Sequence, residues 1–221
     1  ASVFVTVSKF LVEGVNRMVG QGNYTLVHNA VDTNFFFFEP KDQSSFRFIH
    51  VSNMVPLKNA EGILRAFKAY IEAGGSAMLQ LVGNPDDTLP NYANSLGLTP
   101  DRVYFTGMVS YQQVAAEMQK SDCLILFSNI ENSPCVIGEA LCCGLPVIAS
   151  NVGGIPELVN TDNSILISPG NEAELVAAMI KVTSVPEKYD RKKIAETASG
   201  KFSYLAIGEQ LNAIYQKILS P

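Results

Sequence analysis

The sequence carries little charge and no concentration of positive charge. Charged residues make up 17% of its 221 residues, and the formal net charge is −5 at pH 7. Proteins that bind nucleic acid or an anionic membrane surface by electrostatics show a basic patch or stripe. The composition therefore argues against nucleic acid as a partner, and a site for a phosphate group has to be built locally.

The chain also lacks long apolar runs. None approaches the roughly 18 residues of a transmembrane helix, and the first residues do not combine a charged start with an apolar stretch, as a secretory signal does. We therefore expect a soluble protein in the cytoplasm. Peripheral attachment of a full-length protein to the membrane stays open.

The four cysteines show no metal-ligand spacing. Cys123, Cys135, Cys142 and Cys143 lie in apolar contexts, and an adjacent helical pair does not easily bridge to itself. We expect buried, reduced thiols and no metal site. Two nucleotide motifs are also missing, because neither G-x-G-x-x-G nor G-x-x-x-x-G-K-[ST] occurs.

Apolar runs alternate with helical periodicity from residue 46 onward, in a chain that is 47% hydrophobic. Short, nearly continuous apolar strands between helices predict a parallel sheet that is buried on both faces. The predicted strands are 46–52, 77–82, 103–105, 123–127, 147–150 and 165–167. The fold class is thus α/β, a doubly wound, Rossmann-like six-stranded sheet whose ligand site lies beyond the carboxyl ends of the strands.

The two ends of the sequence lie outside that sheet. Residues 4–19 are predicted to form a helix, residues 24–28 a short strand, and residues 203–219 a final helix with apolar positions suited to packing. Phe35-Phe36-Phe37-Phe38 is read as a core and hinge cluster, with an exposed surface as the alternative.

A pair of glutamates is the best indication of function. Ser133 is a suitable N-cap and Pro134 suits the first helical position, so Glu131 precedes a helix and Glu139 lies inside it. Because helical side chains lean toward the N-terminus, Glu139 should point back over the free amides of 135–136. Amides can hold a phosphate there, and a carboxylate one turn further in can accept hydrogen bonds from a diol.

The segment from Ser128 to Glu157 resembles the signature of the group 1 glycosyltransferases. It holds the two glutamates, then Gly-Leu-Pro-Val, then Val-Gly-Gly-Ile-Pro-Glu. The resemblance extends from about Phe4 to Tyr215. It implies one half of a GT-B enzyme that usually retains anomeric configuration, with residues 31–200 as the nucleotide-sugar (donor) binding domain, residues 1–30 as a remnant of the N-terminal domain and its connection, and residues 201–221 as a helix that reaches back toward that domain.

The resemblance also implies roles for individual residues. Glu131 would act on the sugar as the catalytic residue, and Glu139 would accept from the ribose hydroxyls. The other implied donor-binding residues are Ser52, Asn53, Lys58, Gly83, Met108, Val109, Pro134, Cys135 and Val136. Asn53 stands where the family usually has arginine, so it offers a hydrogen bond without charge. No Asp-x-Asp motif occurs, and a transferase of this type should need no metal and no cofactor.

The implied partners are a nucleotide-sugar and a glycan or lipid-linked acceptor, as in polysaccharide or cell-envelope glycan biosynthesis. The acceptor would be bound through the missing N-terminal domain, and apolar surface left by its loss could mediate self-association. Two alternatives stay open. One is a non-catalytic nucleotide-sugar-binding or interaction module with a decayed site, and the other is a sugar-nucleotide epimerase of similar fold.

Overall fold

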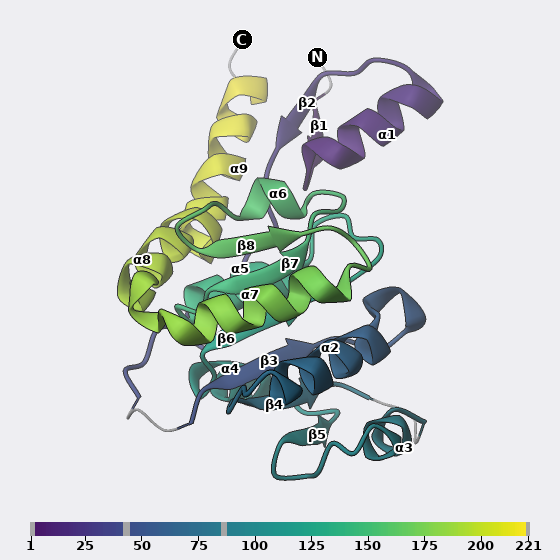
Figure 1. Cartoon of the computed structure of the whole chain (residues 1–221). Helices are drawn as coiled ribbons and strands as arrows, with labels where there is room; N and C mark the ends of the chain where they lie inside the picture. Colours follow the sequence, from purple (N-terminus) through teal and green to yellow (C-terminus); the bar gives the residue numbers. More distant parts are fainter. Residues whose placement is uncertain (1–2, 42–44, 85–87, 220–221) are drawn as a thin grey trace.

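A six-stranded parallel sheet forms the centre of the molecule (Figure 1). The computed structural model describes residues 3–41, 45–84 and 88–219. The strand order is β5-β4-β3-β6-β7-β8, and every neighbouring pair is parallel. The strands are β3 (Arg47–Val51), β4 (Met78–Val82), β5 (Val103–Gly107), β6 (Cys123–Leu126), β7 (Val147–Ser150) and β8 (Ser164–Ile167). The fold class and all six predicted strands are confirmed.

Helices cover both faces of this sheet, as its apolar strands require. On one face α2 (Ala60–Glu72) packs against α7 (Glu172–Ser184), with α3 (Thr88–Ser95) beside α2. On the other face lie α4 (Tyr111–Gln119), α5 (Cys135–Cys142) and α8 (Arg191–Phe202), with α5 against α8. Every residue of β6 and β7 is buried between these layers.

The direction in which the chain adds strands reverses at the centre of the sheet. From β3 the chain proceeds to β4 and β5, whereas from β6 it proceeds to β7 and β8 in the opposite direction. Neighbouring crossovers therefore diverge where β3 meets β6. Such a switch point opens a crevice at the carboxyl ends of the strands.

The N-terminal segment differs from its prediction. Instead of one helix over 4–19, it contains β1 (Phe4–Thr6) and α1 (Lys9–Val19), and β1 pairs in parallel with β2 (Tyr24–Leu26). Ser8 is the N-cap of α1 and accepts the Leu11 N–H at 3.1 Å. A three-residue segment this close to a helix does not reveal its own periodicity, and pairing with β2 decides its conformation.

Two helices close the chain. α9 (Tyr204–Leu219) confirms the predicted final helix, and it extends toward the small β1–β2 sheet (Figure 1). The prediction missed α8, which precedes it. That helix is polar along most of its length and buries only Ile194, Ala195, Ala198 and Phe202, so its apolar periodicity is weak in the sequence.

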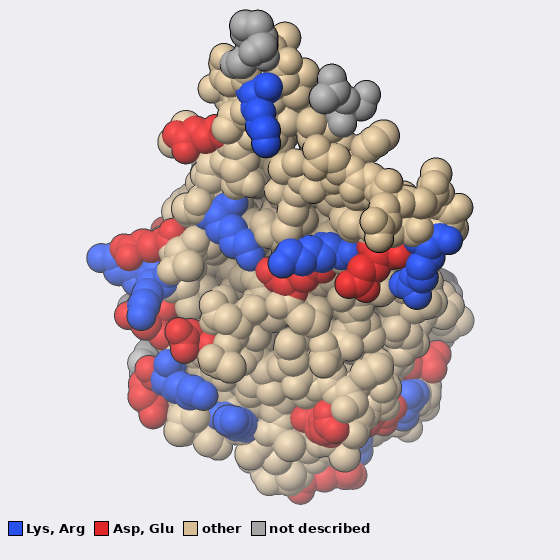
Figure 2. Space-filling view, turned by 90° about the horizontal axis from the view of Figure 1, so that it is seen from above, with Lys and Arg blue, Asp and Glu red and all other residues tan. Residues whose placement is uncertain are grey.

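The surface near α1 and α9 is rich in exposed apolar side chains. Met18, Val19, Leu205 and Leu219 are each more than 70% exposed. The residues of the Phe35–Phe38 run differ in burial, since Phe36 is fully buried and Phe37 is 45% exposed. On the face seen in Figure 2, acidic and basic side chains alternate and form no broad patch of one sign. In the described parts of the chain, each helix is too short or too polar to cross a membrane.

Candidate functional site

Lys58 and Glu131 meet at the switch point of the sheet. Lys58 ends the short helix η1 (Pro56–Lys58) after β3, and Glu131 lies in the loop after β6. The Lys58 Nζ atom is 2.6 Å from Glu131 Oε1, and the Ser128 hydroxyl donates to the same oxygen at 2.8 Å. The Glu131 side chain is only 8% exposed and that of Lys58 23%. The structure thus brings together two predicted site residues that are far apart in the sequence.

Two glycines, Gly153 and Gly154, pack closely against the backbone of the loop that carries Glu131. Gly153 has φ +56°, and a Cβ atom there would lie 1.7 Å from the Glu131 carbonyl oxygen. The Gly154 N–H donates to the Asn132 carbonyl at 2.9 Å. Only a residue without a side chain permits this approach, so the Gly-Gly turn fixes the backbone that carries Glu131.

Ser52 and Gly83 are locked together at neighbouring strand ends. A Cβ atom on Gly83, whose φ is +145°, would lie 1.8 Å from the Ser52 carbonyl oxygen. The Gly83 N–H donates to the Gly107 carbonyl at 3.0 Å. The loops after β3, β4 and β5 are therefore held in fixed positions relative to one another. Met108 comes directly after Gly107, and 77% of its surface is exposed. Asn53 is also exposed, and Val109 is half-buried.

His50 lies beneath this loop and had no role in the prediction. It is fully buried, with Nδ1 2.9 Å from the Ile125 carbonyl and Nε2 2.8 Å from the Ser52 hydroxyl. Since a carbonyl only accepts, Nδ1 donates and Nε2 accepts from Ser52. Burial lowers the pKa of His50 to about 4, and Lys58 contributes in the same direction. His50 is thus a buried residue with both ring nitrogens hydrogen-bonded, and it also anchors Ser52.

Helix α5 begins one residue later than predicted. Its N-cap is Pro134, whose side chain makes no capping hydrogen bond, whereas Ser133 was the predicted N-cap. The Ser133 carbonyl instead accepts a hydrogen bond from the Asn29 side chain at 2.9 Å, which holds this residue outside the helix. The amides of Cys135 and Val136 still belong to the first turn, where N–H groups lack intrahelical acceptors.

The four cysteines differ in burial. Cys123, Cys142 and Cys143 are free and buried, in agreement with the prediction. Cys135 is free but exposed, so burial was wrong for this one residue, because it stands at the outward-facing start of α5.

Glu139 lies one turn into α5 and is half-buried. Burial raises its pKa, and a hydrogen bond from the Tyr111 hydroxyl acts in the opposite direction. Burial and then the Glu139 carboxylate raise the pKa of the Cys135 thiol at the start of the helix. Tyr111 and Ser128 were not among the predicted site residues, although Ser128 stands three residues before Glu131.

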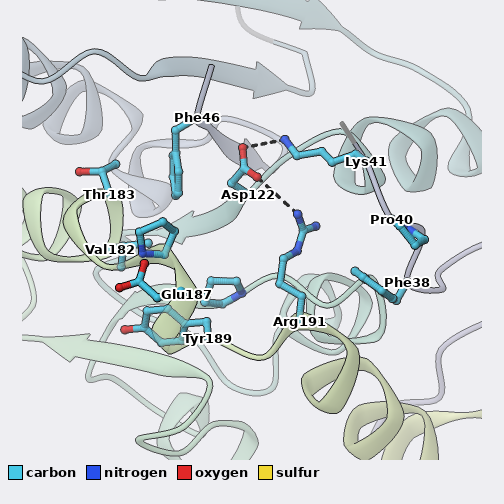
Figure 3. Close-up of a pocket in the computed structure, with 12 residues that line it drawn as sticks. Phe38, Pro40, Lys41, Phe46, Asp122, Val182, Thr183, Glu187, Tyr189 and Arg191 are labelled. Carbon is cyan, nitrogen blue, oxygen red and sulfur yellow. Dashed lines mark hydrogen bonds and ion pairs between the residues drawn. The ribbon is translucent and has the colours of Figure 1, made fainter. Parts of the chain in front are cut away.

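A cavity lies at the opposite end of the sheet. Its volume is about 660 Å³, and its walls include residues that precede β3, β6 and β7 (Figure 3). Asp122 accepts from Lys41 at 2.7 Å and from Arg191 at 3.3 Å. These charges compensate one another, and the cavity is remote from Lys58, Glu131 and Glu139. We therefore place the candidate site at the carboxyl ends of the strands. Within residues 3–41, 45–84 and 88–219, no three His, Cys, Asp or Glu side chains are grouped to hold a metal ion.

Comparison with known proteins defines the class. Residues 31–199 match the family model described as glycosyl transferases group 1, so the chain belongs to this family. It is 27% identical over 234 residues to N-acetyl-alpha-D-glucosaminyl L-malate synthase of Bacillus anthracis, covering 99% of this chain and 60% of that protein.

Two solved structures illustrate the shared fold. Sucrose-phosphate synthase of Thermosynechococcus elongatus superposes with a TM-score of 0.84 at 22% identity, over 99% of this chain and 58% of that one. Anabaena Alr3699/HepE, in complex with UDP and glucose, gives 0.84 at 23% identity, over 98% and 64%. The chain thus has the fold of one GT-B domain and spans about 60% of the length of these proteins.

Proposed function

We propose that this chain is the donor-binding domain of a glycosyltransferase that transfers a sugar from a nucleotide-sugar to a glycan or lipid-linked acceptor. The observation that carries the proposal is the Lys58–Glu131 pair at the switch point, next to the start of α5. The UDP-bound Anabaena structure supports a nucleoside diphosphate as the ligand class.

Lys58 and the amides of Cys135 and Val136 are proposed to bind the diphosphate. A Lys ammonium has three donors, and its bond to Glu131 uses one of them. The helix start adds free N–H groups and the positive end of the dipole. Together they would stabilise the negative charge that develops on the diphosphate as the bond to the sugar breaks, without requiring a metal or another cofactor.

The two glutamates are proposed to contact different parts of the donor. Glu139 accepts from the ribose hydroxyls, while the backbone at Met108 and Val109 meets the base. Glu131, held by Ser128 and Lys58, faces the sugar and stabilises the oxocarbenium-like state as the catalytic residue. Ser52, Gly83 and Pro134 shape the walls, and Asn53 provides a neutral hydrogen bond.

Calorimetry with UDP, GDP, ADP and their hexose conjugates tests the proposal. We expect a Kd on the order of 0.1–1 mM for one nucleotide class. Glu139→Ala should weaken binding by about 1–3 kcal/mol, and Glu131→Ala should weaken it less, because its contact is to the sugar. Glu72→Ala is the matched control, since Glu72 pairs with Lys68 on the surface of α2.

Three results would contradict this assignment. Absence of binding at millimolar ligand would reject the donor site. Equal affinity of both glutamate variants and the unmodified chain would reject the assigned roles. If the complete protein bound a nucleotide-sugar but transferred no sugar to glycan or lipid acceptors, the chain would be a non-catalytic binding module. The uncharged Asn53 is the feature that favours this alternative.

The cellular context is proposed on the same basis. We infer a cytoplasmic location for this domain, where nucleotide-sugars serve as donors, with the acceptor bound elsewhere in the complete protein. The exposed apolar side chains of α1 and α9 are proposed to be covered in that protein and to cause self-association of this chain alone. Sedimentation velocity over a concentration series would show a monomer throughout if this is wrong.

A further inference from the structure

The first turn of α1 is completed by a residue that lies far away in the sequence. The Lys9 N–H donates to Glu157 Oε2 at 2.8 Å, and the Phe10 N–H donates to Glu157 Oε1 at 2.9 Å. Ser8 accepts the Leu11 N–H at 3.1 Å. Because amides of a first helical turn have no acceptor within their own helix, Glu157 satisfies two groups that α1 cannot satisfy itself.

Helix α1 has few other means of attachment. None of its residues is buried, and it lies beside α6 (Ile155–Leu158), the short helix that carries Glu157 (Figure 1). The Lys201 Nζ atom on α8 donates to the Glu157 carbonyl at 3.0 Å, which fixes the backbone of the capping residue. A large part of the attachment of α1 to α6 therefore comes from these polar contacts.

The same end of α1 contacts the loop that carries Glu131. The Ser8 hydroxyl donates to Asn132 Oδ1 at 2.5 Å, and the Asn132 carbonyl accepts the Gly154 N–H at 2.9 Å. A Cβ atom on Gly154 would lie 2.2 Å from that carbonyl oxygen and 2.9 Å from the Ser8 Cβ atom. Ser8 and Gly154 are the N-caps of α1 and α6. The two helix starts thus hold Asn132, the residue directly after Glu131.

The position of this loop matters for the sugar more than for the diphosphate. The Glu131 carboxylate accepts from Ser128 and Lys58, so the loop backbone and these two partners together determine its orientation. Ordering such a group only after a ligand has arrived costs affinity. The diphosphate is proposed to bind Lys58 and the start of α5, which the contact of α1 with Asn132 does not include.

We propose that Ser8 and Glu157 are positioning residues that hold the Glu131 loop against the start of α1 and so increase the affinity for the sugar part of a nucleotide-sugar. The inference rests on the proposed function and adds to its site a segment outside the central sheet. Since two coupled events affect each other equally, binding of a nucleotide-sugar should in turn slow hydrogen exchange of the Lys9 and Phe10 amides.

Calorimetry with UDP and UDP-glucose, or with the GDP or ADP pair if that base binds better, tests the proposal. In Glu157→Ala, we expect the affinity for the nucleotide-sugar relative to the free diphosphate to fall about 3- to 10-fold. Glu157→Gln retains the side-chain length and one acceptor oxygen, so it should lose less. In a chain that already carries Glu131→Ala, Glu157→Ala should leave this ratio unchanged, because the loop then has no carboxylate to position.

Glu174→Ala is the matched control. Glu174 also accepts a backbone N–H, that of Ser168 at 2.6 Å, but it does so after β8 at the edge of the sheet. Hydrogen exchange followed by NMR gives a measurement without nucleotide. The Gly154 amide should exchange about 10-fold faster in Glu157→Ala, and at an unchanged rate in Glu174→Ala.

Faster exchange at Lys9 and Phe10, with no change at Gly154 or in the affinity ratio, would reduce Glu157 to a cap of α1 and overturn the proposal. Equal losses for UDP and UDP-glucose would also overturn it, since general destabilisation has that effect. If the unmodified chain bound none of these nucleotides, the proposed function and the effect on sugar affinity would be rejected together. Unchanged exchange of the Gly154 amide in a chain that does bind would reject only the positioning role.

Discussion

The two ends of the central sheet hold their charged side chains differently. At the amino ends, Asp122 bonds Lys41 and Arg191, and further donors of both cations reach the carbonyls of Lys120, Ser121 and Gly144. At the carboxyl ends, the Lys58 ammonium has one acceptor among the described residues, Glu131, beside the free amides of a helix start. The first arrangement is closed on itself and holds segments together, whereas the second keeps donors for a ligand.

Backbone packing shows the same difference. The carboxyl-end loops approach one another through glycines, and these contacts leave no space for a Cβ atom at Gly83 or Gly153. A ligand site needs its polar groups fixed before binding, because ordering them afterwards costs affinity. The glycines meet this need without filling the site with side chains.

Breaking the glycine packing should have the largest effect. Gly153→Ala places a Cβ 1.7 Å from the Glu131 carbonyl, at a left-handed φ of +56°. We expect a loss of about 3–5 kcal/mol in unfolding free energy, measured by urea denaturation. Gly170→Ala is the matched control, because Gly170 has φ +72° but nothing within 4 Å of a Cβ, and it should lose only about 1–2 kcal/mol.

Acid should lower the free energy of unfolding through His50, which lies near the carboxyl ends of the strands. Its pKa is lowered to about 4 in the folded state, against about 6.5 when unfolded. The unfolded state therefore binds more protons between these values, so stability falls as the pH decreases from about 6.5 to 4, by about 3 kcal/mol from this group. His50→Gln should flatten the pH dependence of unfolding in that window. An unaltered slope would show that other groups cause it.

The amino-end cluster should tolerate change without loss of ligand binding. Asp122→Asn removes the charge that compensates Lys41 and Arg191, whose side chains are each 20% exposed. Because water screens part of this charge, we expect a loss of about 2 kcal/mol in unfolding free energy. Nucleotide affinity should not change by calorimetry. A loss of affinity larger than that of Glu139→Ala would make the two ends functionally equivalent and contradict the comparison.

Sequence reasoning identified the sheet because buried parallel strands are apolar throughout. It failed for β1 and α8, since three-residue strands and polar helices are defined by tertiary pairing rather than by their own pattern. At the site, the glutamate spacing and the family pattern led to Lys58, Glu131 and Glu139. The cap that Glu157 gives to α1 has no such signal, because it depends on how two distant segments pack.

The most direct test of the central claim is to map nucleotide binding onto the two ends of the sheet. Amide chemical shifts of the nitrogen-15-labelled chain would be followed by NMR during titration with UDP, GDP or ADP. We expect saturable shifts at Lys58, Met108, Cys135 and Val136 for at least one nucleotide, with the cavity residues Phe46 and Tyr189 unchanged. Shifts confined to the amino-end cavity, or none at millimolar nucleotide, would contradict the account.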